Sequence, residues 1–120
     1  MKTPLIAAAL CILPCIAGAQ QQQATTALGG ELRVLDKLNG TVTDLELSNG
    51  ETKNLGFLGV TLEECRYPQA NPSGDAFADL TVTYRDQAEP AFEGWLIASA
   101  PALNAMEHPR YDVWVLRCIR

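Results

Sequence analysis

Residues 78–85 read Ala-Asp-Leu-Thr-Val-Thr-Tyr-Arg, and this stretch decides the fold class. Apolar and polar residues alternate along it, which is the period-2 pattern of a β-strand with one buried and one wet face. Pro and Gly residues precede it within 67–74, and a turn over 87–90 follows. We therefore expect a half-buried strand over 78–84 between two loops.

Similar short apolar runs, separated by turn residues, extend outward from this strand in both directions. Asn39-Gly40 and Asn49-Gly50 are strong hairpin signals, because both residue types tolerate positive φ, and together they predict a meander. The last run is apolar on both faces, which predicts a central or covered strand. The further strands are expected over 32–38, 42–47, 57–65, 92–97 and 111–118.

The segment 99–107 breaks this β pattern. Pro101 suits the first position of a helix, with Ser99 near the capping position, so we expect one short helical turn near 101–106. With the runs above, the sequence predicts an all-β fold. It is a small antiparallel sandwich or barrel of about six or seven short strands.

The first 19 residues have the three parts of a cleavable signal peptide. Lys2 supplies the positive charge, residues 5–16 form the apolar run, and Ala17-Gly18-Ala19 offers the small residues that signal peptidase recognises. The run is too short for a stable transmembrane helix, which needs about 20 apolar residues. We expect cleavage before Gln20, export from the cytoplasm and no membrane span in the mature protein.

The four cysteines divide into two groups. Cys11 and Cys15 leave with the signal peptide, and neither follows a small residue as a lipoprotein signal requires. Cys65 and Cys118 remain, and in an oxidising compartment a disulfide is the default interpretation. The alternative is a redox-active pair, but such pairs usually lie close together in the sequence.

The mature chain is small and acidic. Removing 19 of the 120 residues leaves 101, enough for one core, and we expect a flexible lead-in over 20–30 and a single β domain over 31–120. Without Lys2 the chain has 8 basic and 14 acidic residues, a formal net charge of −6. This balance argues against nucleic acid and anionic membrane surfaces as partners.

Few residues could carry catalysis. His108 is the only histidine, and zinc sites use several His or Cys ligands, so we expect no metal and no other cofactor. Ser99, His108 and Asp112 could form a triad, but no nucleophile elbow surrounds Ser99. A small hydrolase that uses His108 with Asp112 or a serine stays open as an alternative function, as does a small-ligand carrier with a hollow barrel.

The C-terminal third concentrates large apolar side chains. These side chains either fill the core against the disulfide or form a partly exposed docking patch, since such residues anchor protein interfaces. The candidate docking residues are Trp95, Leu103, Met106, His108, Tyr111 and Trp114.

Two motifs in this region resemble a known family. Residues 94–103 read Gly-Trp-Leu-Ile-Ala-Ser-Ala-Pro-Ala-Leu, and 107–118 contain Glu-His-Pro-x-Tyr-Asp-Val-Trp-Val-Leu-x-Cys. With Leu35-Asp36-Lys37, Gly40, the Phe57 region, Cys65 and Ala76-Phe77, they resemble the DUF2155 family of small exported alphaproteobacterial proteins over roughly 35–118. Members often carry Met-Phe where this chain has Leu96-Ile97.

The resemblance implies export to the periplasm and a Cys65–Cys118 pair, but no assigned activity. Members are often encoded near a small accessory protein of respiratory complex I, which implies an accessory or assembly role at the inner membrane. Our leading hypothesis is a non-catalytic periplasmic binding or assembly module. Its expected partner is a protein, such as a respiratory or envelope membrane complex.

Overall fold

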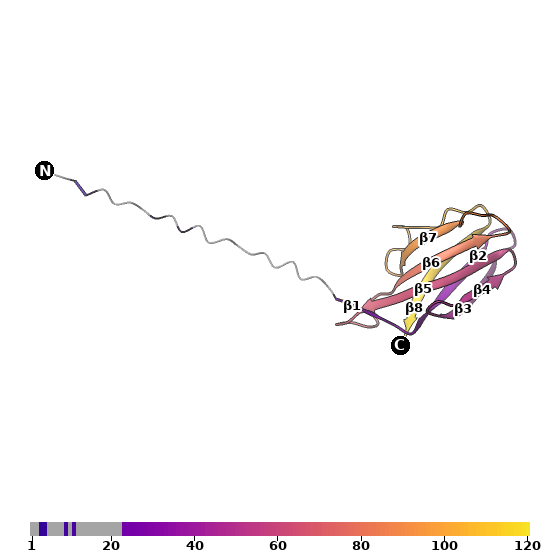
Figure 1. The fold of residues 1–120 in the computed structure, drawn as a ribbon, viewed down its shortest axis with the longest axis horizontal. Helices are drawn as coiled ribbons and strands as arrows, with labels where there is room; N and C mark the ends of the chain where they lie inside the picture. The colour runs from indigo at the N-terminus through magenta and orange to yellow at the C-terminus, as the bar shows by residue number, and fades with distance from the viewer. Residues whose placement is uncertain (1–2, 5–8, 10, 12–22) are drawn as a thin grey trace.

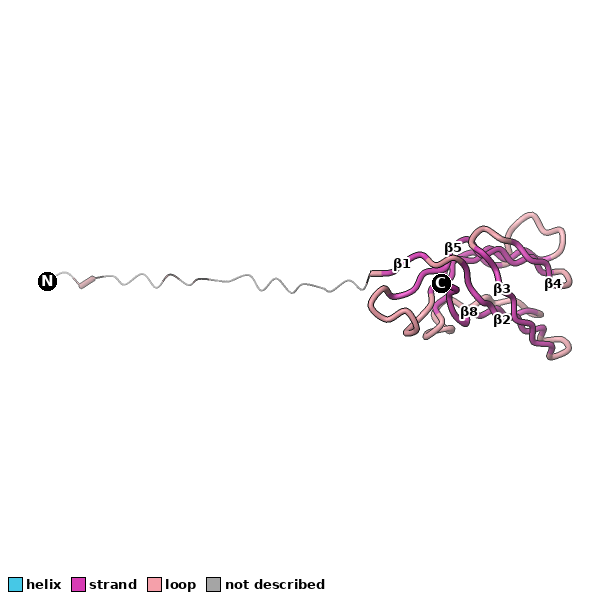
Figure 2. The backbone as a smooth tube through the Cα atoms, turned by 90° about the horizontal axis from the view of Figure 1, so that it is seen from below, coloured by secondary structure: helices cyan, strands magenta, loops and turns pink. Residues whose placement is uncertain are grey.

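The computed structural model describes residues 3–4, 9, 11 and 23–120. The expected cleavage site before Gln20 and most of the predicted signal peptide lie outside these residues. The described chain forms eight β-strands and no helix, in two antiparallel sheets that face each other as a sandwich (Figures 1 and 2). The all-β prediction is therefore confirmed. No helix within the described ranges is long and apolar enough to cross a membrane.

The two sheets differ in size. The three-stranded sheet has the order β3-β2-β8, made of β3 (Thr41–Ser48), β2 (Gly29–Asp36) and β8 (Tyr111–Ile119). The five-stranded sheet has β5 and β6 at its centre, with two short strands sharing the outer edge of β5. Its members are β1 (Ala24–Thr26), β4 (Thr52–Leu55), β5 (Leu58–Pro68), β6 (Phe77–Tyr84) and β7 (Phe92–Ile97).

The strand β6 carries the pattern on which the sequence prediction rested. Ala78, Leu80 and Val82 are fully buried between the sheets, at 0% exposure. Phe77 and Asp79 are only half-buried, because the pleat turns their side chains to the outer face. Burial of the inward residues on both sheets supplies the main free energy that holds the layers together.

Only one of the two Asn-Gly signals closes a hairpin. Asn39-Gly40 joins β2 to β3, which pair from Asp36 and Thr41 onward, and Gly40 has a φ of 75°. Gly50 also has a positive φ of 83°, but β3 pairs with β2 and β4 pairs with β5. The second turn therefore carries the chain from one sheet to the other, and the meander prediction is wrong at this point.

The last strand was predicted to be either central or covered on both faces, and it is not central. β8 pairs with β2 alone and forms an edge of the three-stranded sheet. Val113 and Val115 point into the core, whereas Trp114 is half-buried on the outer face, opposite Arg33 of β2. An apolar residue on the outer face, rather than a second neighbouring strand, explains the two-sided apolar pattern.

Two smaller predictions also need correction. The expected helical turn near 101–106 is a non-helical turn over 101–104, stabilised by a 3.1 Å hydrogen bond from the Leu103 N–H to the Ala100 carbonyl oxygen. The predicted lead-in over 20–30 is not a flexible segment in its described part. Residues 24–26 form β1 on the edge of β5, and β2 begins at Gly29.

Two glycines explain why β2 begins so early. A Cβ on Gly29 would overlap the Leu47 carbonyl oxygen of β3, and a Cβ on Gly30 would lie 3.1 Å from the Cys65 Sγ. Only glycine lets the backbone approach the neighbouring strand and the disulfide this closely. The lead-in was predicted from the polar, glutamine-rich run over 20–26, and the packing role of the two glycines was not recognised.

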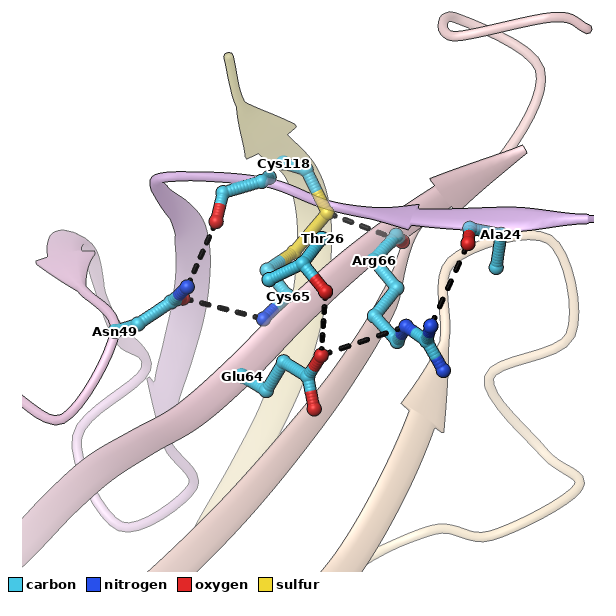
Figure 3. Close-up of polar contacts among 8 residues, drawn as sticks. Ala24, Thr26, Asn49, Glu64, Cys65, Arg66 and Cys118 are labelled. Carbon is cyan, nitrogen blue, oxygen red and sulfur yellow. Dashed lines mark hydrogen bonds and ion pairs between the residues drawn. A yellow bond between two sulfur atoms is a disulfide. The ribbon is translucent and has the colours of Figure 1, made fainter. Parts of the chain in front are cut away.

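A disulfide between Cys65 and Cys118 joins β5 of one sheet to β8 of the other (Figure 3). Asn49 braces it: the side-chain amide donates to the Ala27 carbonyl oxygen at 2.7 Å and accepts from the Cys65 N–H at 3.3 Å. The pair is therefore a structural link at the edge of the core, since Cys65 is 0% exposed and Cys118 is partly buried.

Candidate docking surface

The outer face of the five-stranded sheet carries a strip of apolar side chains around Trp95. Trp95 is 38% exposed and lies opposite Asp79 of β6, while Ile97 lies opposite Phe77 in the next row. Arg66 of β5 pairs with Phe77 and extends the same row. We call Phe77, Trp95 and Ile97, with Ala24 and Arg66 beside them, the apolar strip.

The apolar strip is slightly hollowed. The same five residues line a shallow depression of about 240 Å³. β1 forms one edge of this depression and is held against β5 by two hydrogen bonds. The Thr26 hydroxyl donates to Glu64 Oε1 at 2.7 Å, and Arg66 Nη2 donates to the Ala24 carbonyl oxygen at 3.4 Å (Figure 3). The described part of the lead-in therefore completes this surface.

Acidic side chains border the strip. Asp79 lies between Trp95 of β7 and Glu64 of β5, and Glu93 follows one row further along β7. Burial, and then the charges of nearby glutamates, raise the pKa of the Asp79 carboxyl above its usual value. We call the four residues Glu63, Glu64, Asp79 and Glu93 the acidic rim.

The segment 98–107 packs along the free edge of β7. The Asn104 side-chain amide donates to the Trp95 carbonyl oxygen at 2.9 Å, which occupies one outward-facing backbone group of this edge strand. Leu103, next to it, is 75% exposed, whereas Met106 is 2% exposed and inserts into the core. The segment thus fixes Leu103 close to the edge on which Trp95 lies.

The six docking residues predicted from the sequence do not form one patch. Met106 and Tyr111 are each 2% exposed and belong to the core, so neither lies on a docking surface. Trp114 lies on the outer face of the opposite sheet, away from Trp95. Sequence proximity was misleading here because the consecutive strands β7 and β8 belong to different sheets. Only Trp95 and Leu103 stay together at one edge.

His108 lies near the end of β6, against Tyr84. The two ring centroids are 4.5 Å apart. His108 Nδ1 accepts hydrogen bonds from the backbone N–H groups of Arg110 at 3.1 Å and Tyr111 at 3.2 Å. Burial and the charge of Lys37 lower the pKa of His108. The neutral ring therefore carries its proton on Nε2 and has no free lone pair for a general base.

The candidate triad of Ser99, His108 and Asp112 is not assembled. The Ser99 hydroxyl donates to Asp75 Oδ2 at 2.6 Å, just before β6 begins, whereas His108 packs where β6 ends. The length of β6, about 23 Å, therefore separates Ser99 from His108. Ser99 and Asp75 instead hold the start of the 98–107 segment. Within the described residues, no three His, Cys, Asp or Glu side chains are grouped to hold a metal.

Four surface hollows on the described residues are small, with volumes of about 160, 260, 260 and 240 Å³. Pockets for small ligands usually measure about 300–1,000 Å³. The space between the sheets is packed with Leu and Val side chains. The carrier alternative therefore gains no support from these features.

Comparison with known proteins assigns the chain to a family. Residues 30–118 match the model of an uncharacterized protein conserved in bacteria, DUF2155. The chain belongs to the DUF2155 family. A curated relative, an uncharacterized protein of Rickettsia prowazekii (strain Madrid E), is 28% identical over 92 residues, covering 74% of this chain and 59% of the relative. The chain thus spans little more than half of that protein. No solved structure matches this chain.

The DUF2155 match includes most of the apolar strip but not all of it. Phe77, Trp95 and Ile97 lie inside the matched range, whereas Ala24 of β1 precedes it. Phe77, Ile97 and the acidic rim were not recognised from the sequence as parts of the candidate docking surface. The sequence nevertheless contained a signal. Phe77 alternates in step with the polar residue Asp79 along β6, so its side chain lies on the outer face and not in the core.

In this DUF2155 protein, His108→Ala should lower the free energy of unfolding by about 1–3 kcal/mol, because two backbone N–H groups lose their acceptor. His108→Asn should retain most of the stability, since the amide oxygen can accept from the same groups. Urea unfolding at pH 7.5 measures both variants. An equal loss in both would contradict the acceptor role.

The same histidine predicts a pH effect. Because the folded-state pKa of His108 is lowered, the unfolded chain binds a proton more readily near the unperturbed value of about 6.5. Stability from the neutral ring is complete above that pH and is lost as the pH falls. The drop in unfolding free energy between pH 7.5 and 5.5 should be smaller in His108→Asn than in the wild type.

Proposed function

We propose that this protein is a non-catalytic periplasmic binding or assembly module whose apolar strip docks onto a protein partner. The observation that supports it best is the exposure of Trp95 beside Phe77 and Ile97. Tryptophan in a shallow, mostly apolar depression is typical of residues that dominate binding energy. The core of the domain already lies between the inner faces of the two sheets. Apolar side chains on the outer face are therefore not needed to form it.

The partner chemistry follows from the acidic rim. An apolar centre bordered by Glu64, Asp79 and Glu93 fits a segment with an apolar side chain flanked by Lys or Arg. Such a segment would neutralise the crowded carboxylates, which add to burial in raising the pKa of Asp79. We propose a protein of a respiratory or envelope complex at the inner membrane as the bearer of this segment.

Trp95→Ala should weaken partner binding about 30-fold, which corresponds to the loss of an interface anchor worth about 2 kcal/mol. The measurement is quantitative affinity purification from detergent-solubilised envelopes with a C-terminally tagged chain. The tryptophan is 38% exposed, so its truncation should lower the unfolding temperature less than truncation of a fully buried core side chain would.

Val42→Ala is the matched control, because Val42 is a 54% exposed apolar residue on the other sheet. It should leave recovery of the partner unchanged. Glu93→Gln should weaken binding and reduce its dependence on salt. Equal recovery by folded Trp95→Ala and wild-type protein would refute docking through the strip.

A further inference from the structure

Away from the apolar strip, two arginine side chains lie over one exposed aromatic ring. Phe57, in the turn between β4 and β5, is 50% exposed. The Cζ atoms of Arg85 and Arg110 lie 4.1 Å and 5.7 Å from its ring centroid. Two cations near one ring repel each other, and an anion that lies close to both offsets this repulsion.

The two arginines differ in how they are neutralised. Arg110 Nη2 lies 3.1 Å from Asp36 Oδ2, in a half-buried ion pair. In the described part of the chain, no carboxylate lies within ion-pair distance of Arg85, although Asp86 follows it directly. The Arg85 guanidinium therefore has donors free for an acceptor from outside the protein.

The backbone at Arg85 holds this side chain in place. Arg85 has a φ of 54°, which is uncommon for a residue other than glycine, asparagine or aspartate. Its N–H donates to the Phe57 carbonyl oxygen at 2.8 Å, which fixes the turn against the β4–β5 hairpin. Residues held in such conformations are often found where geometry serves binding.

Tyr84 lies beside these arginines, because the Arg85 Cζ is also 5.4 Å from the centroid of the Tyr84 ring. Hydrogen bonding from Arg85, with the charges of Arg85 and Arg110, lowers the pKa of Tyr84. The ring itself is packed between Phe57, at 6.5 Å, and His108, at 4.5 Å, so the hydroxyl has a defined position. A fixed hydroxyl donor beside two cations can complete the hydrogen bonds of a bound anion.

The geometry points to an oxoanion site in which Arg85, Tyr84 and Arg110 bind the carboxylate or phosphate group of a small molecule. The planar guanidinium of Arg85 matches two oxygens of either group. The exposed Phe57 ring provides an apolar surface for the rest of the ligand. This site needs neither Trp95 nor the acidic rim, so it stands or falls independently of the docking proposal.

The test is an NMR titration of the folded, disulfide-bonded protein with sodium succinate and, separately, sodium phosphate. Sodium chloride at the same ionic strength is the reference. We expect saturable shifts of the Arg85 and Tyr84 signals with at least one of the two anions. Saturation by succinate alone identifies a carboxylate site, and saturation by phosphate alone identifies a phosphate site.

Arg85→Asn removes the guanidinium but suits the positive φ, because asparagine adopts that conformation readily. This substitution should weaken binding of the anion at least tenfold, and Tyr84→Phe should weaken its binding several-fold. Arg33→Asn is the control, since Arg33 is paired with Asp44 at 2.9 Å on the outer face of the other sheet. Linear shifts with both anions, or unchanged saturation in either folded variant, would overturn the site.

Discussion

Replacing both Cys65 and Cys118 by alanine should lower the free energy of unfolding by about 4 kcal/mol. The disulfide closes a loop of 53 residues, so its loss gives the unfolded chain much more conformational freedom. It also joins β5 to β8, which lie in different sheets. A domain of this size has a total stability of about 5–15 kcal/mol, so the double variant should be partly unfolded at 37 °C.

The measurement is urea unfolding followed by circular dichroism, with and without a reductant. The protein should lack Cys11 and Cys15, either by cleavage of the predicted signal peptide or by substitution with serine, so that only one pair of cysteines can respond. Reductant should then destabilise this parent protein and have no effect on the double alanine variant. A parent whose unfolding midpoint is insensitive to reductant would show that the link contributes little.

The second large effect is expected for Gly29→Ala, which should cost about 3 kcal/mol. A Cβ at this position would overlap the Leu47 carbonyl oxygen, and this atom belongs to the backbone of β3 and cannot rotate away. The strands must separate where Gly29 pairs with Ser48. Faster hydrogen exchange at Leu47 and Ser48 should accompany the lower unfolding free energy.

Gly59→Ala is the matched control because Gly59 also lies in a strand. Its Cβ would meet the Thr83 Oγ1 at 2.5 Å, and a hydroxyl side chain can change rotamer. We expect a cost of about 1 kcal/mol there, partly offset by the lower chain entropy of alanine in the unfolded state. If both substitutions cost the same, backbone crowding at Gly29 is not the cause.

The candidate site was predictable only in part. Trp95 was identified from the sequence, because a tryptophan in a short strand near the end of a small domain is an evident interface candidate. Its actual neighbours Phe77 and Arg66 come from strands β6 and β5, and they were not recognised. Hydrophobic alternation says which residues of one strand share a face, but it carries no information about which strand lies beside it.

The sequence by itself determined the local features. Alternation over 78–84 specified a strand and its buried side, Asn39-Gly40 specified a hairpin, and the two cysteines outside the predicted signal peptide left one possible pair. Each of these depends on neighbours along the chain or on simple counting. They could be derived before any packing was known.

The tertiary structure decided which residues meet. It placed Trp95 and Trp114 on opposite layers, buried Met106 and Tyr111, and brought Arg85 to the exposed Phe57 ring. These outcomes depend on the order of strands in each sheet and on how the sheets stack. Long-range contacts of this kind are set by the joint burial of all apolar side chains, so no single stretch of sequence determines them.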